Sequence, residues 1–189
     1  MEKVLTEQQG QTLLKIARMT IAGNLGLEVK KNDSQETVPD IECGTFVTLK
    51  KNSQLRGCIG NLQAADSVTE GIKRNARSAA FHDTRFSPLT TEEFEDIEID
   101  ISVLSQAQVL EYSDGSDLLS KLRPGIDGVI LKLGAAGATF LPQVWEQLPD
   151  AEQFLGRLCR KAGLAETAWQ NSHPQIEVYQ VQCFEEEKA

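Results

Sequence analysis

The chain has 189 residues, of which 40% are hydrophobic and 25% charged, and its formal net charge is −9 at neutral pH. This composition is typical of a globular protein and predicts one domain over residues 1–189, with room for two lobes. A net negative charge argues against general nucleic-acid binding, which depends on neutralising phosphates. The sequence shows neither a secretory signal nor the roughly 18 consecutive apolar residues of a membrane span, so we expect a cytoplasmic protein that does not cross a membrane.

The first half of the chain predicts a helix, a β-hairpin and a second helix. Residues Thr6–Gln9 form a capping box that begins the first helix. A polar segment at 28–42 is expected to be a surface loop. Residues 44–49 and 55–62 favour strands, and the turn residues between them join these strands into a hairpin. Ser67 is expected to cap the second helix, whose apolar residues recur at helical spacing.

The second half predicts mostly strands and one further helix. Residues Ile97–Val103 alternate strictly between apolar and polar, which is typical of a strand with one buried face. A polar stretch at 111–117 separates the two halves, and Asp150 is expected to cap a helix. Further strands are expected at 127–133, 138–141 and 176–184. Because strands and helices mix without regular βαβ alternation, we predict an α+β fold of antiparallel sheets with packed helices.

The segment Leu55–Gly60, Leu-Arg-Gly-Cys-Ile-Gly, carries the clearest functional signal. Glycine weakens a strand and usually marks a bulge or a close approach of another group to the backbone. Alternation along a strand predicts that Arg56 and Cys58 share one face, about 6.6 Å apart. A guanidinium at that distance favours the thiolate form of a cysteine. We therefore expect a site at this strand.

Three interpretations of this site remain open. In the first, Arg56 holds an anionic or carbonyl group of a small ligand, the glycines let it touch the backbone, and polar residues after the second helix close the site. The ligand-binding residues would then be Arg56, Gly57, Gly60, His82, Asp83 and Arg85. The structural alternative is that the glycines accommodate a crossing element and Arg56 pairs with Glu98 or Asp100.

In the second interpretation the protein is an enzyme that uses Cys58 as a nucleophile, activated by a nearby cation or by His82. In the third it is a binding module without chemistry, whose acidic run from Glu92 to Asp117 meets a basic partner. The cysteine and histidine spacing predicts no metal site. The sequence has no glycine-rich nucleotide motif, so we expect no cofactor.

Six ordered blocks of sequence resemble the AMMECR domain family, whose bacterial and archaeal members are called AmmeMemoRadiSam system protein A. These blocks lie at Leu55–Gly60, Ala79–Thr90, Asp100–Ser105, Gly125–Leu131, Ala138–Trp145 and Phe154–Leu164. The resemblance spans roughly residues 8–185. It implies an α+β fold with a larger and a smaller lobe, and genomic association with a Memo-like protein and a radical S-adenosylmethionine protein as partners. It implies no established reaction.

Overall fold

The computed structural model describes residues 5–28, 36–63 and 66–186, and part of the loop expected at 28–42 lies outside these ranges. The chain divides into two compact units. The first consists of the described residues of Met1–Ser105 and Gln182–Ala189, and the second of Gln106–Val181. Within the described ranges, no helix has the length and apolar character needed to cross a membrane.

The first unit is built on a four-stranded sheet. The strands, in the order in which they lie in the sheet, are β2 (Gln54–Asn61), β1 (Thr45–Lys51), β3 (Ile97–Leu104) and β8 (Val181–Glu185). β1 pairs antiparallel with both β2 and β3. The β1–β2 turn has positive φ at Asn52 (52°) and Ser53 (63°), as a type I′ hairpin turn requires. The predicted hairpin is confirmed.

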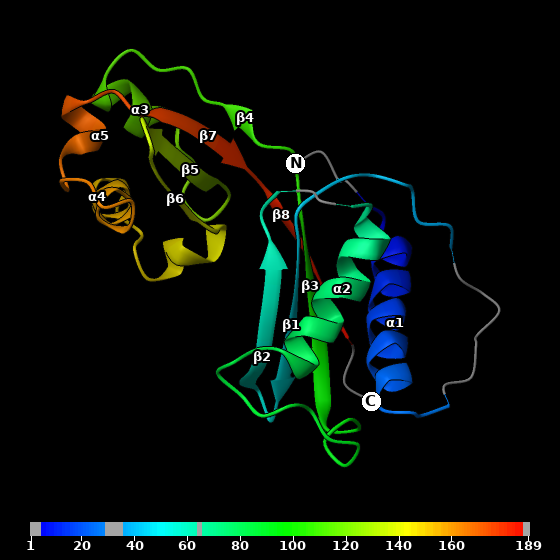
Figure 1. Cartoon of the computed structure of the whole chain (residues 1–189). Coiled ribbons are helices and arrows are strands. Elements are labelled where there is room, and N and C mark those ends of the chain that lie inside the picture. The colour runs from blue at the N-terminus through cyan, green and yellow to red at the C-terminus, as the bar shows by residue number, and fades with distance from the viewer. Residues whose placement is uncertain (1–4, 29–35, 64–65, 187–189) are drawn as a thin grey trace. The chain divides into compact units, whose positions relative to one another are not determined.

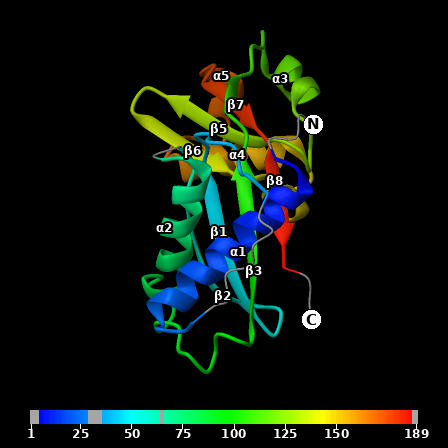
Figure 2. The ribbon, with the colours of Figure 1, turned by 90° about the vertical axis from the view of Figure 1, so that its right-hand side faces the viewer.

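Two helices, α1 (Glu7–Asn24) and α2 (Val68–Phe81), cover one face of this sheet (Figure 1, Figure 2). The capping box predicted at Thr6 is present at the start of α1, and Ser67 caps α2. The alternation in β3 is also confirmed, because its odd-numbered residues from 97 to 103 are buried against the helices. The larger hydrophobic core therefore lies between the sheet and these helices.

The second unit has its own antiparallel sheet and core. Its strands, in sheet order, are β4 (Gln108–Val109), β7 (Gln175–Tyr179), β5 (Gly128–Leu133) and β6 (Ala136–Phe140). Its helices are α3 (Gly115–Lys121), the 3-10 helix η1 (Pro142–Glu146), α4 (Ala151–Lys161) and α5 (Ala168–Asn171). Trp145 stacks on Phe154 at 3.7 Å between ring centroids, which fixes η1 against α4. The α+β fold with antiparallel sheets is confirmed.

Several local expectations were wrong. The single strand predicted at 176–184 is two strands, β7 and β8, which belong to different sheets. The polar stretch at 111–117 contains the start of α3, which Asp114 caps by accepting a hydrogen bond from the backbone N–H of Asp117. Strand β6 begins two residues earlier than predicted, because Gly134 with φ of +59° makes a tighter turn.

Candidate functional site

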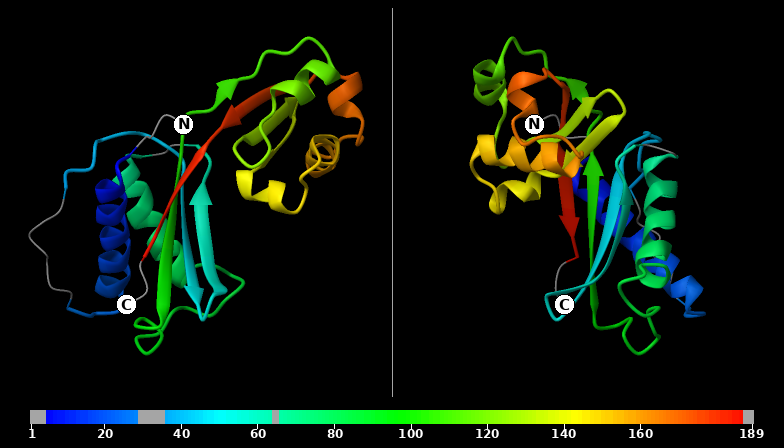
Figure 3. Two further views of the ribbon diagram at one scale, coloured as in Figure 1. Left: turned by 180° about the vertical axis from the view of Figure 1, so that it is seen from behind. Right: turned by 60° about the vertical axis from the view of Figure 1, so that its left-hand side comes forward.

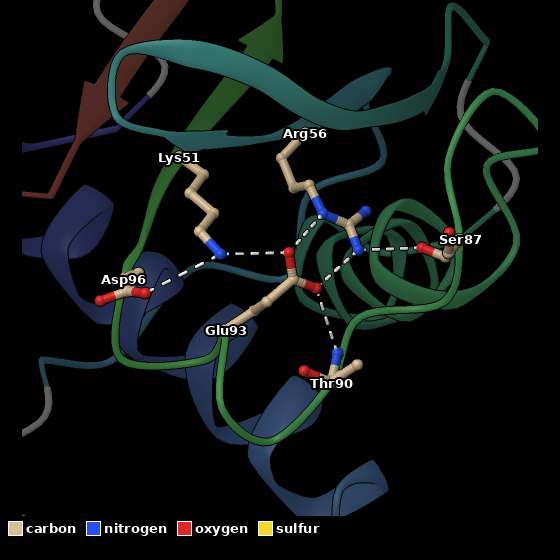
Figure 4. A network of polar contacts seen from close by, with 6 residues as sticks. All are labelled: Lys51, Arg56, Ser87, Thr90, Glu93 and Asp96. Atoms are coloured by element: carbon tan, nitrogen blue, oxygen red, sulfur yellow. Dashed lines mark hydrogen bonds and ion pairs between the residues drawn. The ribbon is translucent and has the colours of Figure 1, made fainter.

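Strand β2 contains a bulge at Arg56. Leu49 pairs with Gly57 and the next residue of β1, Lys50, pairs with Leu55, so the register passes over Arg56. Such a bulge interrupts the alternation of side chains along a strand. The side chain of Arg56 extends from the hairpin on the same side as that of Lys51 (Figure 4). The prediction that Arg56 lies beside the thiol of Cys58 is therefore wrong.

Arg56 binds the segment between α2 and β3, which lies at the same end of the sheet as the β1–β2 turn (Figure 3). Its Nε and Nη2 donate to the Glu93 carboxylate at 3.2 and 2.8 Å, and Nη2 also donates to the Ser87 carbonyl at 2.9 Å. Lys51 Nζ lies 3.3 Å from the same carboxylate. The hydrogen bonds from Arg56 are the main reason that the pKa of Glu93 is lowered to about 2. The third nitrogen of Arg56, Nη1, is buried and has no hydrogen-bond partner.

The acidic partner of Arg56 is thus Glu93, and the structural alternative, which named Glu98 or Asp100, was wrong on this point. Asp100 instead forms an ion pair with Lys50. Sequence reasoning missed Glu93 because it lies in the turn before β3 rather than on a strand next to Arg56. The Thr90-to-Glu93 spacing, which marks a capping turn, was the available signal.

Packing accounts for both glycines of the motif. A Cβ atom at Gly57 would lie 2.3 Å from the backbone carbonyl oxygen of Ala79, so α2 packs directly on this position. A Cβ atom at Gly60 would lie 2.3 Å from the ring of Phe46, which covers that position from the neighbouring strand. These contacts match the crossing element of the structural alternative. The expected contact of either glycine with a ligand stays a prediction.

Asp83 and Arg85 cover the outer edge of β2 beside Cys58. The Asp83 side chain, only 4% exposed, accepts a hydrogen bond at 2.9 Å from the backbone N–H of Cys58. Arg85 donates to Asp83 through Nε and Nη2 at 2.9 and 2.7 Å, and Nη2 also donates to the Cys58 carbonyl at 3.1 Å. The two side chains thus bind the backbone groups that a further strand would bind. His82, which ends α2, is exposed.

The electrostatics of this pair are set mainly by their mutual hydrogen bonds. The Arg85 guanidinium is the largest cause that lowers the pKa of Asp83, and the backbone N–H of Cys58 is the next. The same hydrogen bonds raise the pKa of Arg85. Although anchored in this way, the Arg85 side chain remains 54% exposed. A charged group is therefore held in a fixed orientation next to Cys58 while facing solvent.

The thiol of Cys58 is half-buried and lies opposite Thr48 of β1. Thr48 Oγ1 donates to Sγ at 3.3 Å. Phe86 links the two arginines, since its ring centroid lies 5.8 Å from the Arg56 guanidinium carbon and 5.5 Å from that of Arg85, within the range of cation–π attraction. Sequence reasoning missed Thr48 and Phe86. Only the strand register, which the sequence does not give, brings Thr48 to the thiol.

Some members of the acidic run form ion pairs and others line a surface groove. Its members Glu93, Asp100 and Asp117 pair with lysines or arginines. A groove of about 980 Å³ lies between α1 and the start of β3. The residues that line it are Glu7, Gln11, Leu14, Lys15, Arg18, Asn52, Glu95, Asp96, Ile97, Glu98 and Glu186. Among the described residues, no group of three or more His, Cys, Asp or Glu side chains is arranged to hold a metal ion.

Comparison with known proteins extends this description. The model of the AMMECR1 family matches residues 14–184. A protein of Methanothermobacter thermautotrophicus is 37% identical over 187 residues, covering 97% of each chain. A protein of Sulfurisphaera tokodaii is also 37% identical, over 97% of this chain and 85% of its own length. The crystal structure of an uncharacterized protein from Pyrococcus horikoshii matches with a TM-score of 0.80 and 29% identity, over 98% of this chain and 95% of that one.

Proposed function

This chain belongs to the AMMECR1 family, and on that premise we propose that it is a cytoplasmic protein that binds a small ligand carrying an anionic or carbonyl group at the outer edge of β2. The observation that carries this proposal is the orientation of Arg85. Its guanidinium is held by the buried Asp83 and by the Cys58 carbonyl, yet more than half of the side chain faces solvent.

A guanidinium held in this way has lost its conformational freedom before any ligand arrives. Preorganisation of this kind raises affinity because the cost of ordering a long side chain is not incurred on binding. Arginine also presents its N–H groups in a plane that matches carboxylate, phosphate and carbonyl oxygens. The half-buried Cys58 thiol lies next to this group and would form part of the same site.

The test is a thermal-shift and calorimetric titration of the wild-type protein with four probes, namely inorganic phosphate, acetate, succinate and acetamide. The matched variants are Arg85→Met and Arg77→Met, because Arg77 is an exposed arginine of α2. A ligand that binds only the folded state stabilises it by about 2.7 kcal/mol at a hundredfold excess over Kd. We expect at least one probe to stabilise the wild type and the Arg77 variant but not the Arg85 variant. A response that is absent from the wild type, or equal in all three proteins, contradicts the proposal.

The resemblance to AmmeMemoRadiSam system protein A supports a setting for this binding. We propose that the protein acts together with a Memo-like protein and a radical S-adenosylmethionine protein. Co-purification of the tagged chain with these two proteins, at low and at high salt, tests this directly. Failure to recover either protein at low salt contradicts it, and recovery only at low salt indicates that the acidic surface contributes.

Nucleophilic catalysis by Cys58 is the second candidate, favoured by two contacts. Thr48 donates a hydrogen bond to the sulfur, and Arg85 donates a hydrogen bond to the carbonyl oxygen of Cys58, so the cation that contacts this residue is Arg85 rather than the expected Arg56. Mass-resolved alkylation with iodoacetamide at neutral pH tests it, with the exposed Cys183 as internal reference. Labelling of Cys58 faster than Cys183 and slowed by Arg85→Met supports a reactive thiolate. Labelling no faster than Cys183 rules the candidate out.

A further inference from the structure

Arg56 has a hydrogen-bonding capacity that the protein itself does not use. Two of its nitrogens, Nε and Nη2, bind the Glu93 carboxylate and the Ser87 carbonyl. Nη1 is buried without a partner, and Figure 4 shows it directed away from Glu93. A buried donor left without an acceptor destabilises the folded state. The side chain is only 12% exposed, so bulk solvent does not supply that acceptor freely.

The charges around Arg56 are already balanced. Arg56 and Lys51 carry two positive charges, and Glu93 and Asp96 carry two negative charges. The N–O distances are 2.8 Å for Arg56–Glu93, 3.3 Å for Lys51–Glu93 and 3.8 Å for Lys51–Asp96. An anion added at Nη1 would therefore introduce a negative charge without a counter-ion, and burial of an unpaired charge is expensive. A neutral oxygen acceptor would satisfy the N–H groups and leave this balance unchanged.

We infer that Nη1 of Arg56 binds the oxygen of a neutral amide carbonyl, from a carboxamide or from a peptide bond, rather than an anion. The inference rests on the proposed function, in that it names the chemical class of one group of the ligand. Access requires local movement, because Nη1 is buried. The segment from Phe86 to Asp96 has no helix or strand and contacts Arg56 through the Ser87 carbonyl and the Glu93 side chain. Because Leu89 and Phe94 anchor this segment in the core, the movement must be confined to the residues around Ser87 and Glu93.

The experiment is an NMR titration that follows the guanidinium signals of Arg56 in ¹⁵N-labelled protein, assigned by their loss in Arg56→Lys. The probes are acetamide, N-methylacetamide and acetate, all at equal concentrations. We expect a saturable shift with an amide and binding of acetate at least about tenfold weaker, a ratio that corresponds to about 1.4 kcal/mol. Tighter binding of N-methylacetamide identifies a peptide bond as the source of the carbonyl, and tighter binding of acetamide identifies a primary carboxamide.

The variant Glu93→Gln tests the charge argument directly. It removes the carboxylate that neutralises Arg56, so the preference between amide and acetate is expected to reverse. Lys51→Met is the matched control, because it keeps the Arg56–Glu93 pair, removes one positive charge and should weaken acetate further. If Glu93→Gln does not fold, the charge argument is decided by the affinity for the amides relative to acetate, compared between the wild type and Lys51→Met.

Two results overturn the inference. The first is acetate preferred over both amides in the wild type. The second is no saturable shift of Arg56 with any probe while its Nη1 protons exchange magnetisation with water, which means that a buried water is the only acceptor. An Arg56 response that persists in Arg85→Met, together with unchanged binding of the other probes by that variant, supports the inference while contradicting the proposed function. Binding that depends on Arg85 without any response at Arg56 supports the proposed function and contradicts the inference.

Discussion

The replacement Gly57→Ala distinguishes a packing role of the motif glycine from a purely ligand-binding one. The new Cβ atom would lie 2.3 Å from the carbonyl oxygen of Ala79, whereas ordinary contacts begin near 3.4 Å. The group that it meets is helix backbone, which cannot rotate away as a side chain can. Strand β2 and helix α2 would have to separate by roughly 1 Å within a closely packed layer.

Overpacking of this kind typically lowers the free energy of unfolding by about 1–3 kcal/mol. We expect a loss of about 3 kcal/mol for Gly57→Ala, because the new Cβ atom meets backbone. In a chain of this size that loss lowers the melting temperature by roughly 6–12 °C. Gly23→Ala is the matched control, because Gly23 lies in α1 with no atom within 4 Å of the added Cβ, and it should stabilise the protein by about 0.5–1 kcal/mol. Thermal and urea unfolding of both variants give the comparison. A Gly57→Ala protein within about 0.5 kcal/mol of the wild type refutes the packing argument.

Two further predictions concern the carboxylates that bind the two arginines. Asp83→Asn removes the charge that orients Arg85, and the NH2 group that replaces one carboxylate oxygen cannot accept the hydrogen bonds that this oxygen accepts from Arg85 and Cys58. We expect faster hydrogen exchange at the Cys58 amide and a loss of about 1–3 kcal/mol in the free energy of unfolding. Unchanged exchange would contradict the claim that Asp83 protects this N–H at the edge of β2. Glu93 has a pKa of about 2 in the folded protein against an ordinary value of 4.5, so its contribution to stability is complete above about pH 4.5 and is lost as the pH falls towards 2. Urea unfolding between pH 7 and pH 3 should therefore show a smaller decrease in Glu93→Gln than in the wild type, and equal decreases would be inconsistent with the Arg56–Glu93 pair.

The larger elements of the fold could be predicted because their signals are local. The helix N-caps, the strict alternation in β3 and the turn residues of the first hairpin depend only on neighbouring residues. The division of the last strand into β7 and β8 could not be predicted, because the apolar residues continue across the break at Gln180. Which sheet each half joins depends on pairing with distant strands.

The candidate site was predicted only in part. The sequence pointed to Leu55–Gly60, because two glycines, an arginine and a cysteine are unusual together within a strand, and the structure confirms that this segment lies in strand β2. The partners of Arg56 were not predicted, because the bulge moves this side chain away from Cys58 and towards Glu93. The glycines of the motif indicated a bulge as one possibility, but they did not give its position at Arg56. Its role in binding a ligand stays a proposal.

The most direct test of the central claim is chemical-shift mapping of backbone amides during titration of the ¹⁵N-labelled protein with the probe that stabilises it best. The account predicts saturable shifts concentrated at Cys58, Asp83 and Arg85, which persist in Arg77→Met and disappear in Arg85→Met. Saturable shifts that map elsewhere on the protein, or that survive the loss of the Arg85 guanidinium, would contradict it.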